Sequence, residues 1–147
     1  MNYNINIELL IGINIFMLSV IYFTQFVSYP LFLKVSKEKF TSYHDAYTVY
    51  ISFIVAPAMV IELLLSLNIL RYQIDLISAI NLILISIIWL STFLIQVPIH
   101  YKISKGFNKR LIKKLIHTNW IRTISWTIKL IAIYILNTWL PKIQKKI

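Results

Sequence analysis

The sequence predicts an all-α integral membrane protein, a four-helix bundle with a short amphipathic cytoplasmic helix between the third and fourth spans. Apolar residues make up 59% of the 147-residue chain, and its mean hydropathy is +0.73. Charged residues make up only 14%, against about a quarter in soluble domains. A soluble chain of this size buries only about 60–70% of its surface on folding. It therefore could not hide this much apolar surface from water.

Four segments are long and apolar enough for a membrane helix, which needs about 20 residues. They cover roughly residues 9–33, 48–70, 76–99 and 115–140. The first and third contain no charged residue, the second contains Glu62, and the fourth contains Arg122 and Lys129. We interpret residues 1–147 as a single transmembrane domain, with no recognisable internal repeat.

The basic residues predict the orientation of the spans. The second loop contains one basic residue, Arg71. The first loop contains Lys34, Lys37 and Lys39. The third loop contains six: Lys102, Lys105, Lys109, Arg110, Lys113 and Lys114. Because basic loops stay in the cytoplasm, both termini are expected outside a bacterial-type cytoplasmic (inner) membrane. The formal net charge of +10 then reflects topology and contact with anionic lipid rather than nucleic acid.

Turn and amphipathic signals fill in the loops. Pro30 and Pro98 lie at the cytoplasmic ends of the first and third spans, and Pro141 ends the fourth. Gly106 marks a turn in the third loop. From Phe107 to Ile116, apolar residues alternate with Lys and Arg, which is typical of a short basic helix lying on the membrane surface.

Polar residues recur at helical spacing within the spans, and each must find a partner or water there. The stripe on the fourth span comprises Asn119, Arg122, Trp126 and Lys129. The stripe on the third span comprises Trp89, Phe93, Gln96 and His100. The stripe on the first span comprises Asn14, Tyr22, Gln25 and Tyr29. These stripes predict a partly hydrophilic interior.

Glu62 and Lys129 are expected to form an ion pair. Both lie about 14 residues into spans that run outward, so both reach a depth of about 20 Å at 1.5 Å per residue. A lone charge at the centre of a span costs about 2.5–3.5 kcal/mol, which a pair would relieve. The pair is either purely structural or part of a site that handles protons or a ligand.

A second group of polar residues lies near the cytoplasmic boundary. Its members are Tyr29, His44, Gln96, His100, Asn119, Trp120 and Arg122. Two histidines that exchange protons near neutral pH, two amides and a fixed cation make this the candidate site. Asp45, next to His44, could orient an imidazole. The alternative is that these residues cap helices and contact lipid head groups.

The sequence contains no Cys, and its three His show no metal-ligand spacing. We therefore predict no metal site and no cofactor, with haem between His44 and His100 as a minor alternative. Glycine-rich phosphate loops and nucleophile motifs are also missing from the sequence.

The segments Gln-Val-Pro-Ile-His at 96–100 and Thr-Asn-Trp-Ile-Arg-Thr at 118–123 resemble the anthrone-oxygenase-like family of small four-helix membrane proteins, most of them of unknown function. The matching positions are Pro98, His100, Asn119, Arg122 and Thr123. The chain departs from the family at His100, where Asn is usual, and in the order of Asn119 and Trp120.

The resemblance implies cofactor-independent oxygenation of a phenolic or polycyclic aromatic substrate. His100 or His44 would act as the base, and Arg122 would stabilise the resulting anion. Asn119 and Gln96 would position the substrate. Trp89, Phe93 and Trp126 would line an apolar pocket.

Three functional hypotheses follow. In the first, the protein binds a lipophilic small molecule inside the bundle. The candidate catalytic residues are His100, Arg122 and His44. The candidate ligand-binding residues are Gln96, Asn119, Glu62, Lys129, Trp126 and Trp89. In the second, the chain is a non-catalytic accessory subunit of a larger membrane complex. A proton or ion path through Glu62 and Lys129 is a third alternative. The expected partners are the bilayer and either a lipophilic molecule or other membrane subunits.

Overall fold

In the part of the chain that the computed structural model describes, residues 3–72 and 75–144, the protein consists of helices joined by short loops, and no strand is present. Residues 3, 4, 77 and 135–144 are described by their backbone alone. Its α-helices are α1 (Tyr3–Phe23), α2 (Tyr29–Phe32), α3 (Lys37–Tyr72), α4 (Leu76–Ser91), α5 (Val97–Ile103) and α6 (Lys109–Gln144). Two π-helices, η1 (Thr24–Ser28) and η2 (Thr92–Gln96), join α1 to α2 and α4 to α5. The chain therefore forms four long helical segments.

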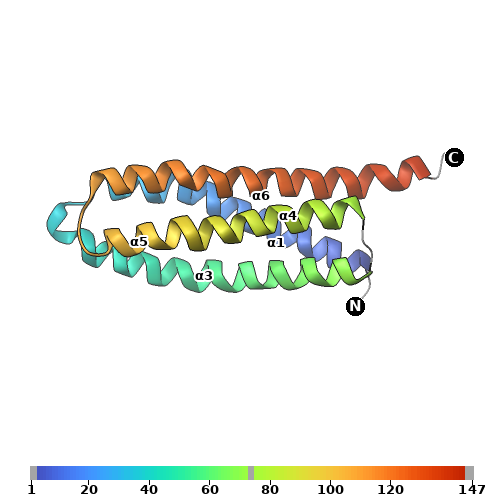
Figure 1. Ribbon diagram of the computed structural model, residues 1–147, viewed down its shortest axis with the longest axis horizontal. Helices are drawn as coiled ribbons and strands as arrows, with labels where there is room; N and C mark the ends of the chain where they lie inside the picture. The colour runs from blue at the N-terminus through green and yellow to red at the C-terminus, as the bar shows by residue number, and fades with distance from the viewer. Residues whose placement is uncertain (1–2, 73–74, 145–147) are drawn as a thin grey trace.

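These four segments run side by side, and each reverses the direction of the one before it (Figure 1). The segment α1 packs against α3 and α6, and α4 packs against α3 and α6. At the end that carries the first and third loops, α5 packs against α6. We call this end the loop end. Each of α1 and α4 thus lies between the two long helices α3 and α6.

Three of the helical segments are long and apolar enough to cross a membrane: Ile5–Phe32, Lys37–Tyr72 and Ser78–Ile103. They correspond to the first three predicted spans. The predicted fourth span, 115–140, lies within α6, but its side chains beyond Tyr134 fall outside the described residues. Pro141 does not end this helix, because α6 continues to Gln144.

The short amphipathic helix predicted before the fourth span does not exist as a separate element. The side chain of Asn108 accepts a hydrogen bond from Leu111 N at 3.0 Å and so caps the start of α6. From Lys109 the helix continues unbroken through residue 118. The prediction was wrong because no residue in this stretch stops a helix. The apolar side of the stretch also packs in a core rather than on a membrane surface: Ile112 and Leu115 are both fully buried.

Gly106 lies in the turn between α5 and α6, as predicted, and has φ +150°. A Cβ atom would strain the backbone there, so glycine is required by conformation rather than by space.

The two halves of the chain repeat the same order of elements, although no repeat was recognised in the sequence. Each half has a helix, a five-residue π-helix, a proline, a short loop and a 36-residue helix. Each π-helix begins with a threonine six residues before the proline, Thr24 before Pro30 and Thr92 before Pro98. Both threonine hydroxyls donate to the carbonyl four residues earlier, at 2.9 and 2.8 Å. The π-turn shifts the helix register just where proline would remove a backbone hydrogen bond.

Beside its buried apolar clusters, the protein buries more polar and charged side chains, and exposes more large apolar ones, than is typical of a soluble protein. Asn6, Asn14, Glu62, Asn119 and Lys129 have side chains with no exposed surface. Large apolar side chains cover the outside, among them Phe53 at 75% and Leu94 at 70% exposed. This pattern makes the interior the place to look for a site.

Candidate functional site

A chain of hydrogen bonds connects three helical segments near the loop end. Tyr29 OH lies 3.0 Å from His100 Nε2, and His100 Nδ1 lies 2.9 Å from His44 Nε2. The two imidazoles stack with centroids 5.2 Å apart. His44 Nδ1 lies 3.5 Å from the carboxylate of Asp45, which is 56% exposed. The chain therefore leads from the interior to the surface.

Arg122 sets the direction in which the hydrogen bonds of this chain are donated. Its Nη2 donates to Tyr29 OH at 3.2 Å, so the single phenolic proton of Tyr29 is directed at His100 Nε2. In that arrangement His100 Nδ1 donates to His44 Nε2. The N–H at His44 Nδ1 then faces the Asp45 carboxylate at 3.5 Å without a hydrogen bond between them. All donors then point from the buried cation toward the exposed anion.

The guanidinium of Arg122 is held by neutral groups. Its Nε donates to Asn119 Oδ1 at 3.1 Å, and its Nη1 lies 3.5 Å from Thr92 Oγ1. Asn119 Nδ2 donates to Gln25 Oε1 at 2.8 Å. Arg122 is only 6% exposed, and none of the salt bridges among the described residues includes it. A buried positive charge thus remains without a negative partner in this part of the chain.

Gln96 does not pair with Asn119 but donates from Nε2 to Thr118 Oγ1 at 3.3 Å. Its Oε1 is buried without a hydrogen-bond partner, as is Trp89 Nε1. Both side chains line the cavity described below. They are free to bond to a ligand there.

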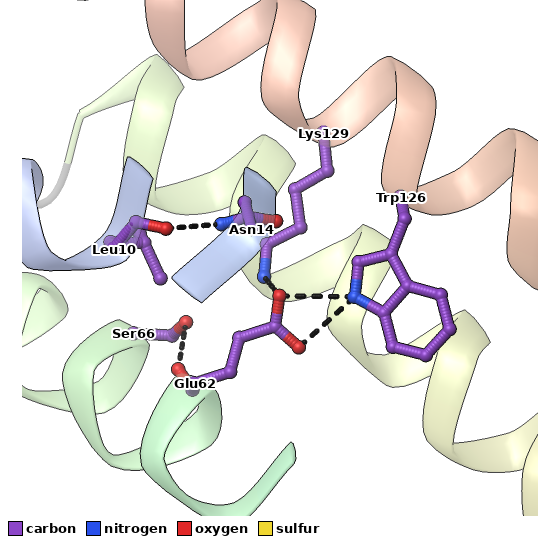
Figure 2. A network of polar contacts seen from close by, with 6 residues as sticks. All are labelled: Leu10, Asn14, Glu62, Ser66, Trp126 and Lys129. Carbon is purple, nitrogen blue, oxygen red and sulfur yellow. Dashed lines mark hydrogen bonds and ion pairs between the residues drawn. The ribbon is translucent and has the colours of Figure 1, made fainter. Parts of the chain in front are cut away.

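Glu62 and Lys129 form the predicted ion pair, which is confirmed at 2.6 Å between Lys129 Nζ and Glu62 Oε1 (Figure 2). Trp126 Nε1 donates to both carboxylate oxygens, at 3.1 and 3.2 Å. All three side chains have no exposed surface. Because the ring of Trp126 also lines the cavity, the ion pair holds one wall of the cavity in place.

The cavity has a volume of about 680 Å³ and lies between α3 on one side and α4, η2 and α5 on the other, with α1 and α6 at its back. Along α3 it reaches from His44 to Val60, about 24 Å at 1.5 Å per residue. Most of its polar residues lie at the loop end, next to Tyr47, Ile51, Val97 and Tyr101; these polar residues are His44, Asp45, Thr48, Ser52, Gln96, His100 and Ser104. Its deep end is apolar, and the residues there are Met17, Ile21, Val55, Met59, Val60, Trp89 and Trp126.

The structure brings most of the sequence-predicted site residues together. All of the proposed catalytic residues line the cavity, as do Gln96, Trp89 and Trp126, whereas Asn119, Glu62 and Lys129 stand behind its wall. The whole stripe on α6 is buried as predicted. Phe93 also lines the cavity, as predicted, but is 55% exposed. Tyr22 of the stripe on the first span is 38% exposed. Trp120, also placed in the candidate site, is 37% exposed and stacks edge-on against Phe26.

Sequence reasoning missed Thr92, which accepts from Arg122, and both π-helices. The equal spacing of Thr24 and Thr92 from the prolines that follow them is the sequence signal that could have indicated the two π-helices. Short π-helical turns occur frequently at functional sites.

Metal chemistry has no obvious place among the described residues. No group of three or more His, Asp or Glu side chains comes together in residues 3–72 and 75–144. A haem iron between His44 and His100 would need their mutual hydrogen bond to open, because both nitrogens would have to face the iron.

Comparison with protein-family models, with curated proteins and with solved structures gave no match. The fold and the site define an all-helical protein with an elongated cavity that is polar at one end and apolar at the other.

Proposed function

We propose that the chain is a small polytopic membrane protein that binds a lipophilic small molecule in the cavity between α3 and α5. The observation that carries the proposal is the cavity itself, whose volume of about 680 Å³ falls within the range typical of ligand sites, about 300–1,000 Å³. It combines an apolar wall with a few convergent polar groups, as such sites do.

The exposed apolar surface supports insertion in a membrane. Residues such as Phe53, Leu64 and Leu94 are at least 60% exposed, and a water-soluble monomer rarely carries so wide an apolar surface. We propose four passes, with α6 as the fourth. The positive charges of the first and third loops support an orientation with the loop end in the cytoplasm and both termini outside. The cell membrane of a bacterial-type cell is the proposed location.

The resemblance to anthrone-oxygenase-like proteins extends the proposal to catalysis. His100 would exchange its bond to Tyr29 OH for the substrate, remove a proton from an enolisable or phenolic group at Nε2, and pass a proton from Nδ1 to His44 and on toward Asp45. Arg122 would stabilise the resulting anion, and dioxygen would be the oxidant. The unbroken contacts from Arg122 through Tyr29 to His44 favour this candidate.

Narrowing the cavity tests ligand binding. Val55 lines the cavity, so Val55→Phe is expected to fill part of it and weaken binding at least tenfold. The probe is the methyl ester of 9,10-dibromostearic acid, whose bromines quench tryptophan on contact. In detergent-solubilised protein, Trp89 and Trp126 are expected to report saturable quenching.

Val49→Phe is the matched control, because Val49 lies on the same helix, is 53% exposed and does not line the cavity. It is expected to quench like the wild type. Equal quenching of Val55→Phe and Val49→Phe would place the probe outside the cavity and contradict the proposal. If quenching never saturates and other membrane proteins co-purify, the accessory-subunit alternative is favoured instead.

A further inference from the structure

The charge of the cavity points to a more specific ligand than a lipophilic molecule in general. Arg122 lines the cavity, and only 6% of its surface is exposed. Its described partners are Tyr29, Asn119 and Thr92, all uncharged. Burying a charge is costly unless a charge of opposite sign accompanies it.

The chain's own carboxylates do not neutralise Arg122 in the described structure. Glu62 is bound to Lys129, and Asp75 caps the start of α4 at the opposite end of the helices. Asp45 lies at the surface end of the histidine chain, beyond both imidazoles. Glu8 and Glu38 are exposed. An anion held at Arg122 therefore has to come from a ligand.

The polarity of the cavity also has a direction. Most of its polar groups lie at the loop end, and the apolar groups of its deep end lie toward the middle of the helices. A membrane lipid has the same arrangement, with its head at the surface and its chain toward the bilayer centre. An amphiphile could lie in the cavity without reversing its orientation in the bilayer.

The side of the cavity is open between α3 and α5. Residues on both edges of this opening are strongly exposed, with Val60 at 45%, Phe93 at 55%, Val97 at 49% and Tyr101 at 64%. Those on α3 and η2 lie within helical segments apolar enough to cross a membrane. The opening therefore faces the region that lipid would occupy.

From the uncompensated charge, the direction of polarity and the lateral opening, we infer that the ligand is an anionic single-chain amphiphile. It enters from the bilayer between α3 and α5, and its carboxylate or phosphate pairs with Arg122. The second N–H of Gln96 Nε2 donates to the head, and the chain lies along Val55, Met59 and Trp126. His100 acts through Tyr29, which it holds beside Arg122. This inference rests on the proposed function, since it specifies the ligand of the same cavity.

The test compares 9,10-dibromostearic acid with its methyl ester at pH 9, where the acid is ionised and only the ester is neutral. Saturable tryptophan quenching of the detergent-solubilised full chain gives a Kd for each. We expect the wild type to bind the acid at least tenfold more tightly than the ester. Arg122→Gln is expected to bring the two Kd values within about twofold by weakening the acid alone, and Arg122→Lys is expected to retain a preference for the acid.

Arg110→Gln is the matched control, because Arg110 lies on the same helix but is exposed at its start. It is expected to keep the wild-type ratio. If Arg122→Gln does not fold, the ratio of the two wild-type Kd values, for the acid and for the ester, decides whether the cavity prefers an anionic head. Competition by palmitate against 1-palmitoyl-lysophosphatidate then shows whether the preferred head is a carboxylate or a phosphate.

Three results would overturn the inference. Equal, saturable binding of acid and ester by the wild type would contradict the anionic head while leaving the proposed cavity site intact. A similar loss in Arg110→Gln and Arg122→Gln would assign the preference to general surface charge. Saturable binding of neither compound would contradict the proposed function itself.

Discussion

Lys129→Met is expected to destabilise the protein more than any other single change, by about 3–5 kcal/mol, because it leaves the Glu62 carboxylate buried without a counter-charge. Glu62 has no exposed surface and would retain only the Trp126 N–H as a side-chain donor. Thermal unfolding in detergent and the yield of folded protein would measure the loss.

The double variant Glu62→Gln with Lys129→Met is expected to recover most of the stability. It removes both charges, and the Gln carbonyl can still accept from Trp126 Nε1. Lys113→Met is the control for a lysine on the exposed side of the same helix, and it is expected to be neutral. Wild-type stability in Lys129→Met alone would show that the ion pair does not support the fold.

His100→Leu is expected to have the second largest effect, since His100 is the central member of the hydrogen-bonded chain. The substitution leaves Tyr29 OH and His44 Nε2 without their shared partner. Each unsatisfied buried group costs about 1–3 kcal/mol. The unfolding temperature is expected to fall, and dibromostearate is expected to bind at least tenfold less tightly in the quenching titration.

His117→Leu provides the control for losing an imidazole, because His117 is exposed on α6. We expect it to change neither the unfolding temperature nor the affinity. If His100→Leu behaved like His117→Leu in both measurements, the histidine chain would have no part in stability or in binding.

The ion pair shows how much depth alone can predict in a membrane sequence. Counting residues from the predicted boundary placed Glu62 and Lys129 at the same level, and charge complementarity then paired them. The stripe from Asn119 to Lys129 was equally predictable, because α6 has regular helical spacing and no interruption through this region.

The π-helices explain where the same reasoning failed. Helical-wheel spacing assumes 3.6 residues per turn, and a π-turn inserts an extra residue and rotates everything beyond it. Phe93 lies inside η2 and is therefore largely exposed, although Gln96 three residues later is buried. Asn119 donates to Gln25 and not to Gln96. This choice of partner depends on side-chain positions that helical spacing does not give.

The predicted surface helix failed for a different reason. An amphipathic pattern identifies a helix with one apolar side but does not say what covers that side. Here the partners are Phe32 and Phe40, from the other half of the chain, in one buried cluster with Ile112 and Leu115. Such long-range packing could not be read from residues 107–116 alone.

If the cavity holds a lipophilic ligand, that ligand is expected to co-purify with the protein and to be detected by mass spectrometry. Protein extracted in mild detergent from its native membrane would be washed and its bound small molecules released with organic solvent. We expect one amphiphile at close to one molecule per chain from the wild type and Val49→Phe, and at least tenfold less from Val55→Phe. The same lipid mixture in equal amounts from all three proteins would contradict the presence of a ligand in the cavity.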